Sequence, residues 1–133
     1  MECPRPVDLI ERLREVAQAC PGLDALILYG SRARGAATPH SDWDLGYLAS
    51  GELDAGDLHA RIVEALGDDR VDLVDLARAS GQLHYRAAAD ARTIFERTPR
   101  SVERLRVEAI AYWLDMAPVV RAEYEARLAK LSR

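Results

Sequence analysis

The fold of this 133-residue chain is decided by the stretch ALILYGSRARGAATPHSDWDLGYL, residues 25–48. The stretch contains a short continuous apolar run, residues 25–29, then a polar segment that contains glycine, and then residues 43–48, which also predict a strand. A continuous apolar run of this length, bounded by turn residues, is typical of a buried strand. We therefore expect two strands joined by a loop in which polar groups are concentrated.

The segments on both sides of this stretch have helical patterns. Apolar residues recur at helical spacing over residues 7–20, and a Pro-Gly pair follows them. A second helix is expected to begin at a cap supplied by Asp54 or Asp57 and to end at Gly67. Cys20, at the end of the first helical stripe, is expected to be a buried free thiol.

The remainder of the chain continues the alternation of helices and strands. Residues 71–76 predict a third strand, residues 82–89 a short helix and residues 92–95 a short edge strand. A helical pattern begins at Ser101, and Pro118 must kink or split it because proline has no N–H to donate. Such alternation predicts a single α/β (α+β) domain, a small mixed β-sheet flanked by helices. Its expected extent is residues 1–133, with a core over 7–96 and C-terminal helices over 101–131.

Composition and charge narrow the function classes. The formal net charge of −4 disfavours nucleic acid as a direct partner. No apolar run approaches the ~20 residues needed to cross a bilayer, and the first residues lack a secretory layout, so we expect a cytoplasmic protein without membrane contact. The net charge of residues 97–133 is +3, whereas that of residues 1–96 is −7. This difference indicates either a partner surface on the C-terminal segment or ordinary solvated helix faces.

The chemistry-bearing residues flank the polar loop. Asp42 and Asp44 are two apart, so on a strand they point to the same face. Paired carboxylates on one face suit Mg²⁺, which binds through a few carboxylates and leaves the rest of its shell to water and phosphate. At the other end of the loop, Gly30 permits a close backbone approach, and Ser31 offers a hydroxyl and an N–H to a phosphate.

The joint pattern resembles a known family. Gly30-Ser31, a ten-residue spacer and Asp42-Trp43-Asp44 are similar to the motif of the DNA polymerase β-like nucleotidyltransferases. The fuller form, Gly-Ser-Arg-Ala-Arg-Gly through Ser-Asp-Trp-Asp-Leu, resembles the minimal nucleotidyltransferase (MNT) branch. The resemblance covers nearly the whole chain. It implies the nucleotidyltransferase fold, with ATP as substrate, Mg²⁺ (two ions) as cofactor and release of pyrophosphate.

The resemblance also implies a partner. Many single-domain MNT proteins are antitoxins that inactivate a HEPN-domain RNase toxin by adding AMP to one of its tyrosines. In this chain Asp42, Asp44 and a third acid would be the catalytic and metal-binding residues. Gly30, Ser31, Arg34 and Ser41 would bind the nucleotide, although a purely structural role for Arg34 remains equally open.

The third acid lies in the third predicted strand. Asp72 and Asp75 differ by three positions, so on a regular strand they face opposite sides. We favour Asp72, because the family pattern has an acid after the first apolar residue of this strand. Asp75 would then end the strand or bind a neighbouring backbone N–H. Trp43, between the two loop acids, is expected to point into the core.

Two alternative functions remain open on the sequence. An MNT-fold antitoxin can mask its toxin by contact alone, without catalysis. A small nucleotidyltransferase can instead modify an antibiotic or another small molecule. The clustered acids disfavour the first alternative. The lack of a second acceptor-binding domain within these residues favours a protein acceptor over a small molecule.

Overall fold

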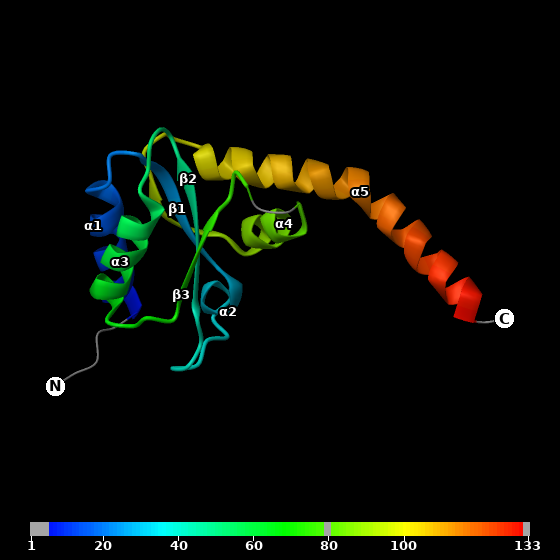
Figure 1. Ribbon diagram of the computed structural model, residues 1–133, viewed down its shortest axis with the longest axis horizontal. Coiled ribbons are helices and arrows are strands. Elements are labelled where there is room, and N and C mark those ends of the chain that lie inside the picture. The colour runs from blue at the N-terminus through cyan, green and yellow to red at the C-terminus, as the bar shows by residue number, and fades with distance from the viewer. Residues whose placement is uncertain (1–5, 79–80, 132–133) are drawn as a thin grey trace.

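The computed structural model describes residues 6–78 and 81–131, which form four strands and five helices. In chain order these elements are α1 (Pro6–Gln18), β1 (Leu23–Tyr29), α2 (Gly30–Ala33), β2 (Trp43–Ala49), α3 (Ala55–Leu66), β3 (Val71–Asp75), α4 (Gly81–Asp90), β4 (Arg92–Glu96) and α5 (Ser101–Leu131). The strands form one mixed sheet with the order β3-β2-β1-β4. β1 pairs antiparallel with both β2 and β4, whereas β2 and β3 are parallel. Figure 1 shows α1 and α3 on one side of this sheet and α4 and α5 on the other.

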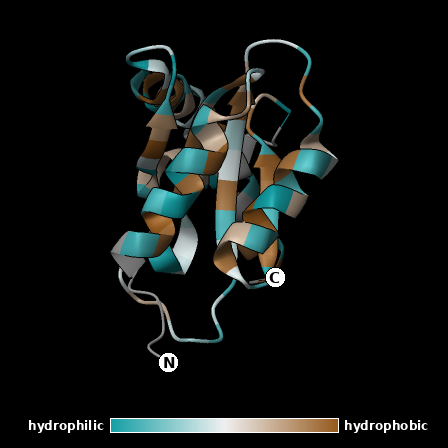
Figure 2. Ribbon diagram, turned by 90° about the vertical axis from the view of Figure 1, so that its left-hand side faces the viewer, coloured by the Kyte–Doolittle hydropathy of each residue, from teal (hydrophilic) through white to brown (hydrophobic). Residues whose placement is uncertain are grey.

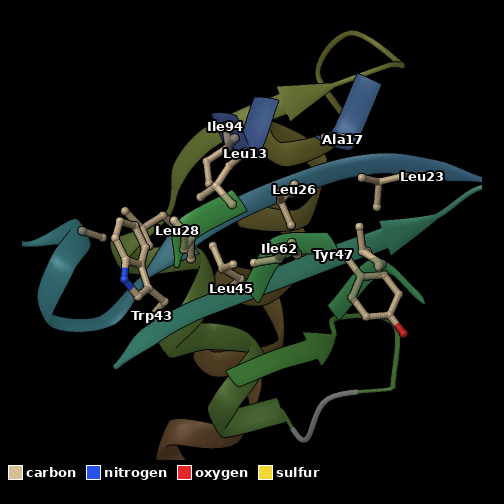
Figure 3. Close-up of a cluster of buried hydrophobic side chains, with 13 residues drawn as sticks. Leu13, Ala17, Leu23, Leu26, Leu28, Trp43, Leu45, Tyr47, Ile62 and Ile94 are labelled. Carbon is tan, nitrogen blue, oxygen red and sulfur yellow. The ribbon is translucent and has the colours of Figure 1, made fainter. Parts of the chain in front are cut away.

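The larger core lies between the sheet and the pair α1 and α3. Residues at alternate positions of β1 and β2 face these helices, as the period of two in a strand requires. Figure 2 views this side, with both helices in front of the strands and hydrophilic and hydrophobic stretches alternating along each. In Figure 3, Trp43 and Tyr47 lie towards opposite ends of the labelled cluster, which is otherwise aliphatic. The buried members are Leu13, Ala17, Leu23, Leu26, Leu28, Ala33, Trp43, Leu45, Tyr47, Leu58, Ile62, Leu66 and Ile94.

A smaller core lies on the opposite face, under α4 and the first turns of α5. It contains the other alternate residues of β1, and small alanines of α4 allow this helix to approach the sheet. Its buried members are Ala25, Ile27, Tyr29, Leu76, Ala87, Ala91, Val102 and Leu105. This cover is incomplete, because α4 is short and α5 leads away from the sheet (Figure 1).

The helix α5 continues through Pro118 without a break in its assigned residues. Figure 1 shows that the helix changes direction in its orange part, the region that contains Pro118. Proline removes one helical hydrogen bond and crowds the preceding turn, which bends a helix. The expected kink is therefore present, and the helix is not split.

Most predicted elements are confirmed, and the helix caps show why. Asp54 caps α3 by accepting a 3.0 Å hydrogen bond from the Asp57 N–H, and Gly67 ends the helix in the left-handed conformation. Cys20 is a free thiol as predicted, but the prediction that it is buried was wrong. Helix α1 ends at Gln18, so Cys20 lies in the following turn and is only half-buried. Within residues 6–78 and 81–131, no helix is long and apolar enough to cross a membrane.

Candidate functional site

Three polar side chains lie in a row where three strands pair. The register places Tyr29 opposite Asp44, and Asp44 opposite Asp72. Side chains in register on neighbouring strands point to the same face of a sheet. Here that face is the one only partly covered by α4 and α5, because Trp43 and Leu45 fill the core on the other side. The row therefore borders an open part of the structure.

Gly30 brings the chain close to this row. It begins α2 with a positive φ of 75°, a conformation that favours glycine. A Cβ atom at this position would lie 2.3 Å from Oδ2 of Asp44. The backbone of Gly30 therefore packs directly against the Asp44 carboxylate, which an L-residue at position 30 would displace.

Two arginines fix the loop between α2 and β2. Arg32 donates hydrogen bonds of 2.8 and 3.2 Å to the backbone oxygen of Ser41, and its guanidinium lies 4.3 Å from the ring centre of Trp43. Arg70 donates to the backbone oxygens of Pro39 (3.1 Å) and His40 (2.9 Å). Because both arginines bind the loop next to the start of β2, they set the position from which Asp44 projects.

A pocket of about 330 Å³ lies over the carboxylate row. Four separate segments of the chain line it: the β1–α2 junction, β2, β3 and α4. Its size and concave form suit part of a small-molecule ligand. A larger cavity of about 460 Å³ lies beside Trp43, but no carboxylate lines it, so it lacks ligands for a metal. The smaller pocket is lined by Tyr29, Gly30, Ser31, Arg34, Asp44, Asp72, Arg86 and Asp90.

The charges in this pocket perturb its ionisable groups. Burial raises the pKa of the Asp44 carboxyl, and the negative charges of Asp72 and Asp42 raise it further. Burial likewise raises the pKa of Tyr29 to about 12, with additional contributions from Asp72 and Asp44. Both shifts express the cost of adding negative charge here, a cost that a bound cation would relieve.

The same carboxylates fit a divalent metal ion. Mg²⁺ uses one or two carboxylates together with water and substrate phosphate oxygens. Asp44 and Asp72, on adjacent strands and in register, supply two such oxygen ligands. Within residues 6–78 and 81–131, no group of three His, Cys, Asp or Glu side chains is arranged to hold a metal ion by itself. A metal bound here would therefore complete its shell with phosphate and water.

The structure brings together five of the seven residues predicted for the site. Gly30, Ser31, Arg34, Asp44 and Asp72 all line the pocket. The other two, Ser41 and Asp42, do not line it. Ser41 instead accepts a 2.9 Å hydrogen bond at its Oγ from the Thr38 N–H, and Asp42 is exposed in the loop, directly before β2.

The competing acid lies elsewhere. Asp75 pairs in register with Tyr47, and its Oδ1 accepts a 3.0 Å hydrogen bond from the Ala77 N–H at the end of β3. It does not line the pocket. Asp72, which does, is therefore the better placed of the two acids considered for the third carboxylate.

Sequence reasoning missed three residues of the pocket, namely Tyr29, Arg86 and Asp90. Tyr29 was assigned only to the apolar run that predicts a strand. Arg86 and Asp90 are four apart on α4, a spacing that places them on one helix face. That spacing was visible in the sequence, but the face that α4 turns to the sheet was not.

At the end of β1, a glycine-serine turn lies beside the Asp44 carboxylate of β2 and, one strand further, the Asp72 carboxylate of β3, an arrangement that suits metal-assisted transfer of a phosphorus group. The chain belongs to the polymerase beta nucleotidyltransferase family, whose characteristic sequence matches residues 11–100. This match contains every residue of the pocket. No curated protein matches the chain.

Solved structures extend the likeness beyond the family domain. A chain from a toxin–antitoxin complex with AMP-PNP is 26% identical, with a TM-score of 0.69, over 93% of this chain and 98% of that chain. A chain from a mutant of the MntA–HpeT toxin–antitoxin complex is 29% identical, with a TM-score of 0.65, over 98% and 100%. A chain from a tri-AMPylated Shewanella oneidensis HEPN toxin in complex with an MNT antitoxin is 25% identical, with a TM-score of 0.64, over 94% and 97%. These matches include α5 as well as the sheet.

Proposed function

We propose that this chain is a nucleotidyltransferase antitoxin that transfers AMP from ATP to a tyrosine hydroxyl of a HEPN toxin. The observation that carries the proposal is the pocket in which Asp44 and Asp72 face the Gly30-Ser31 turn. The similar complexes support the finer assignment, because one contains AMP-PNP and another an AMPylated HEPN toxin. ATP and the toxin are thus the expected substrates.

The pocket residues would have different roles in the reaction. Ser31 and Arg34 would donate hydrogen bonds to phosphate oxygens, and charge-assisted bonds of this kind are strong. Asp44 and Asp72 would hold Mg²⁺, and we retain exposed Asp42 as the third expected ligand. Two Mg²⁺ ions held there would supply positive charge to offset the charge that develops on phosphate oxygens during transfer. Little covalent help from the protein is required, because phosphoryl-type transfer depends on positioning and electrostatics.

The transfer itself is a displacement at the α-phosphorus. The tyrosine oxygen of the acceptor forms a bond to this phosphorus while the bond to the pyrophosphate oxygen breaks. The hydroxyl proton leaves to a carboxylate or to solvent. An unperturbed tyrosine has a pKa near 10, so its hydroxyl needs such a group beside it at neutral pH.

Helix α5 offers a surface for the protein acceptor. Val107, Ile110 and Leu114 are 62%, 49% and 65% exposed, and their spacing places them along one side of the helix. Apolar residues spaced in this way are common anchors for a helical partner. The same stripe would serve an antitoxin that acts by masking alone, which keeps contact inhibition as the second candidate.

The deciding experiment is mass spectrometry of a HEPN toxin after incubation with this protein, ATP and Mg²⁺. A HEPN protein encoded next to this chain would be the acceptor to test first. We expect the toxin to gain mass in AMP units and to lose RNase activity. An Asp44→Asn variant should still form the complex but leave the toxin mass unchanged.

A Leu114→Ser variant provides the complementary measurement. It should weaken the complex while leaving Mg²⁺-dependent ATP binding intact, because Leu114 lies outside the pocket. If the Asp44→Asn variant protects cells from the toxin as fully as the wild type does, masking replaces catalysis as the function.

A further inference from the structure

Helix α4 contributes two charged side chains to the pocket. Arg86 and Asp90 both line it, opposite the turn that carries Ser31 and Arg34. They lie one helical turn apart and thus on the same face of α4. The pocket consequently has a positively charged residue on each of two walls, Arg34 on one and Arg86 on the other.

The two arginines differ in their partners. Arg34 forms an ion pair with Asp90, with 2.6 Å between Nη1 and Oδ2, so part of its hydrogen-bonding capacity is already used. Arg86 is exposed and forms no hydrogen bond or ion pair with any residue of the ranges 6–78 and 81–131. Arg86 nevertheless lines the same pocket as Asp44 and Tyr29. Arg86 is therefore an available cation beside the carboxylate row.

The adjoining helix holds α4 in place. The ring of Tyr85 stacks on Trp113 of α5, with 5.0 Å between ring centres and 17° between the planes. Arg106 of α5 also donates a hydrogen bond to the backbone oxygen of Ala91, directly after α4. These contacts on either side of Arg86 set the direction from which its side chain enters the pocket.

We propose that Arg86 binds the triphosphate of the nucleotide from the α4 side, and that it thereby selects nucleoside triphosphates over monophosphates. The inference rests on the nucleotide site of the proposed function and adds a residue to it. A guanidinium presents several donors in one plane and binds phosphate oxygens in pairs, which suits a residue with no partner in the protein. Arg34, already paired with Asp90, has less capacity for this role.

Equilibrium binding of Mg²⁺-ATP without toxin tests the proposal. The variants are Arg86→Gln, which removes the charge, and Arg86→Lys, which keeps it. Arg61→Gln is the matched control, because Arg61 lies on α3 across the sheet and pairs with Asp57 on its own helix. We expect Arg86→Gln to weaken Mg²⁺-ATP binding about 10- to 100-fold, the range for hydrogen bonds to charged groups. Arg86→Lys should recover part of this loss, and Arg61→Gln should show none.

Two further measurements separate phosphate binding from simple charge balance. AMP affinity should change by less than about 3-fold in Arg86→Gln, because AMP lacks the phosphates in question. Mn²⁺ alone should bind to this variant as tightly as to the wild type or more tightly, since a cation has been removed beside its carboxylates. The wild type gives an independent readout, in which Mg²⁺-ATP protects Arg86, but not Arg61, from modification by phenylglyoxal.

Each result has a distinct consequence. Unchanged Mg²⁺-ATP affinity in Arg86→Gln, or absence of protection at Arg86, overturns the assignment of Arg86 and leaves the proposed function standing. Equal losses for ATP and AMP overturn the assignment to the triphosphate. Failure of the wild type to bind Mg²⁺-ATP overturns the proposed function itself, and the role of Arg86 with it.

Discussion

Replacement of Gly30 by alanine tests how the chain positions Asp44. The added Cβ would lie 2.3 Å from Asp44 Oδ2 and 3.1 Å from its Cγ, far inside normal contact distances. The φ of 75° adds backbone strain that glycine does not experience. The carboxylate must therefore rotate away from its present position, or the β1–α2 junction must move.

The expected cost has two parts. A non-glycine residue in the left-handed region costs about 1–2 kcal/mol. Displacing the Asp44 side chain from its rotamer adds about 0.5–1.5 kcal/mol. Gly35→Ala is the matched control, because Gly35 has a φ of 74° but no atom within 4 Å of an added Cβ. The change in unfolded-chain entropy is the same for both variants, so the difference between them isolates the contact with Asp44.

Urea unfolding gives the stability of each variant, and Mg²⁺-ATP affinity and AMP transfer give the function. We expect Gly30→Ala to be less stable than Gly35→Ala by about 0.5–1.5 kcal/mol. Transfer should fall about 100-fold, the effect of a shift of about 1 Å in a positioned group. In an Asp44→Ala background, the excess stability cost of Gly30→Ala should largely disappear.

Equal stability losses in Gly30→Ala and Gly35→Ala, with transfer retained in both, would refute this reasoning. The carboxylate would then tolerate the Cβ, and Gly30 would not be what fixes its position. An excess cost that persists in the Asp44→Ala background would place the clash on another group.

Three other perturbations have expected outcomes. Asp44→Asn should stabilise the protein at neutral pH by about 0.2–1 kcal/mol, because it removes a charge directly opposite Asp72. Because the pKa of Asp44 is raised in the folded state, folding favours its protonated carboxyl. The stability difference between the variant and the wild type, measured by urea unfolding, should therefore shrink as the pH falls and Asp44 becomes protonated in the wild type. Tyr29→Phe should remove from the ultraviolet titration the phenol whose pKa is raised to about 12. The variant should also lack the loss of folding stability that the wild type shows between about pH 10 and 12, because in that range the tyrosine ionises in the unfolded chain before it ionises in the folded one. Pro118→Ala should raise the temperature at which the helical circular dichroism signal of α5 is lost, because proline costs about 3 kcal/mol in a helix interior, while Mg²⁺-ATP affinity stays unchanged.

Local patterns were sufficient to predict most of the fold. The apolar run before Gly30 and the segment of residues 43–48 predicted β1 and β2, because residues that are buried in a sheet are mostly apolar. Asp54 and Gly67 marked the ends of α3 because capping depends on neighbouring backbone groups. Each of these signals involves residues only a few positions apart.

The parts of the pocket that depend on distant contacts were not predictable in this way. The ion pair between Arg34 and Asp90 joins residues 56 positions apart, and neither residue carries a local sign of it. The family motif placed Ser41 and Asp42 among the site residues, but hydrogen bonds within the loop hold Ser41 and exposure leaves Asp42 outside the pocket lining. Motifs identify which residues carry chemistry, whereas the packing of α4 decides which of them share a cavity.

The strand order has a consequence for the time course of folding. β4, the last strand to be synthesised, pairs with β1, the first, so that Ala25 and Glu96 become partners across most of the domain. Contacts between such distant residues slow the search for the native topology. On the ribosome, the Gly30-Ser31 turn and Asp44 emerge well before α4 supplies the opposite wall. A nascent chain therefore acquires all four walls of this pocket only after residue 90 has left the exit tunnel.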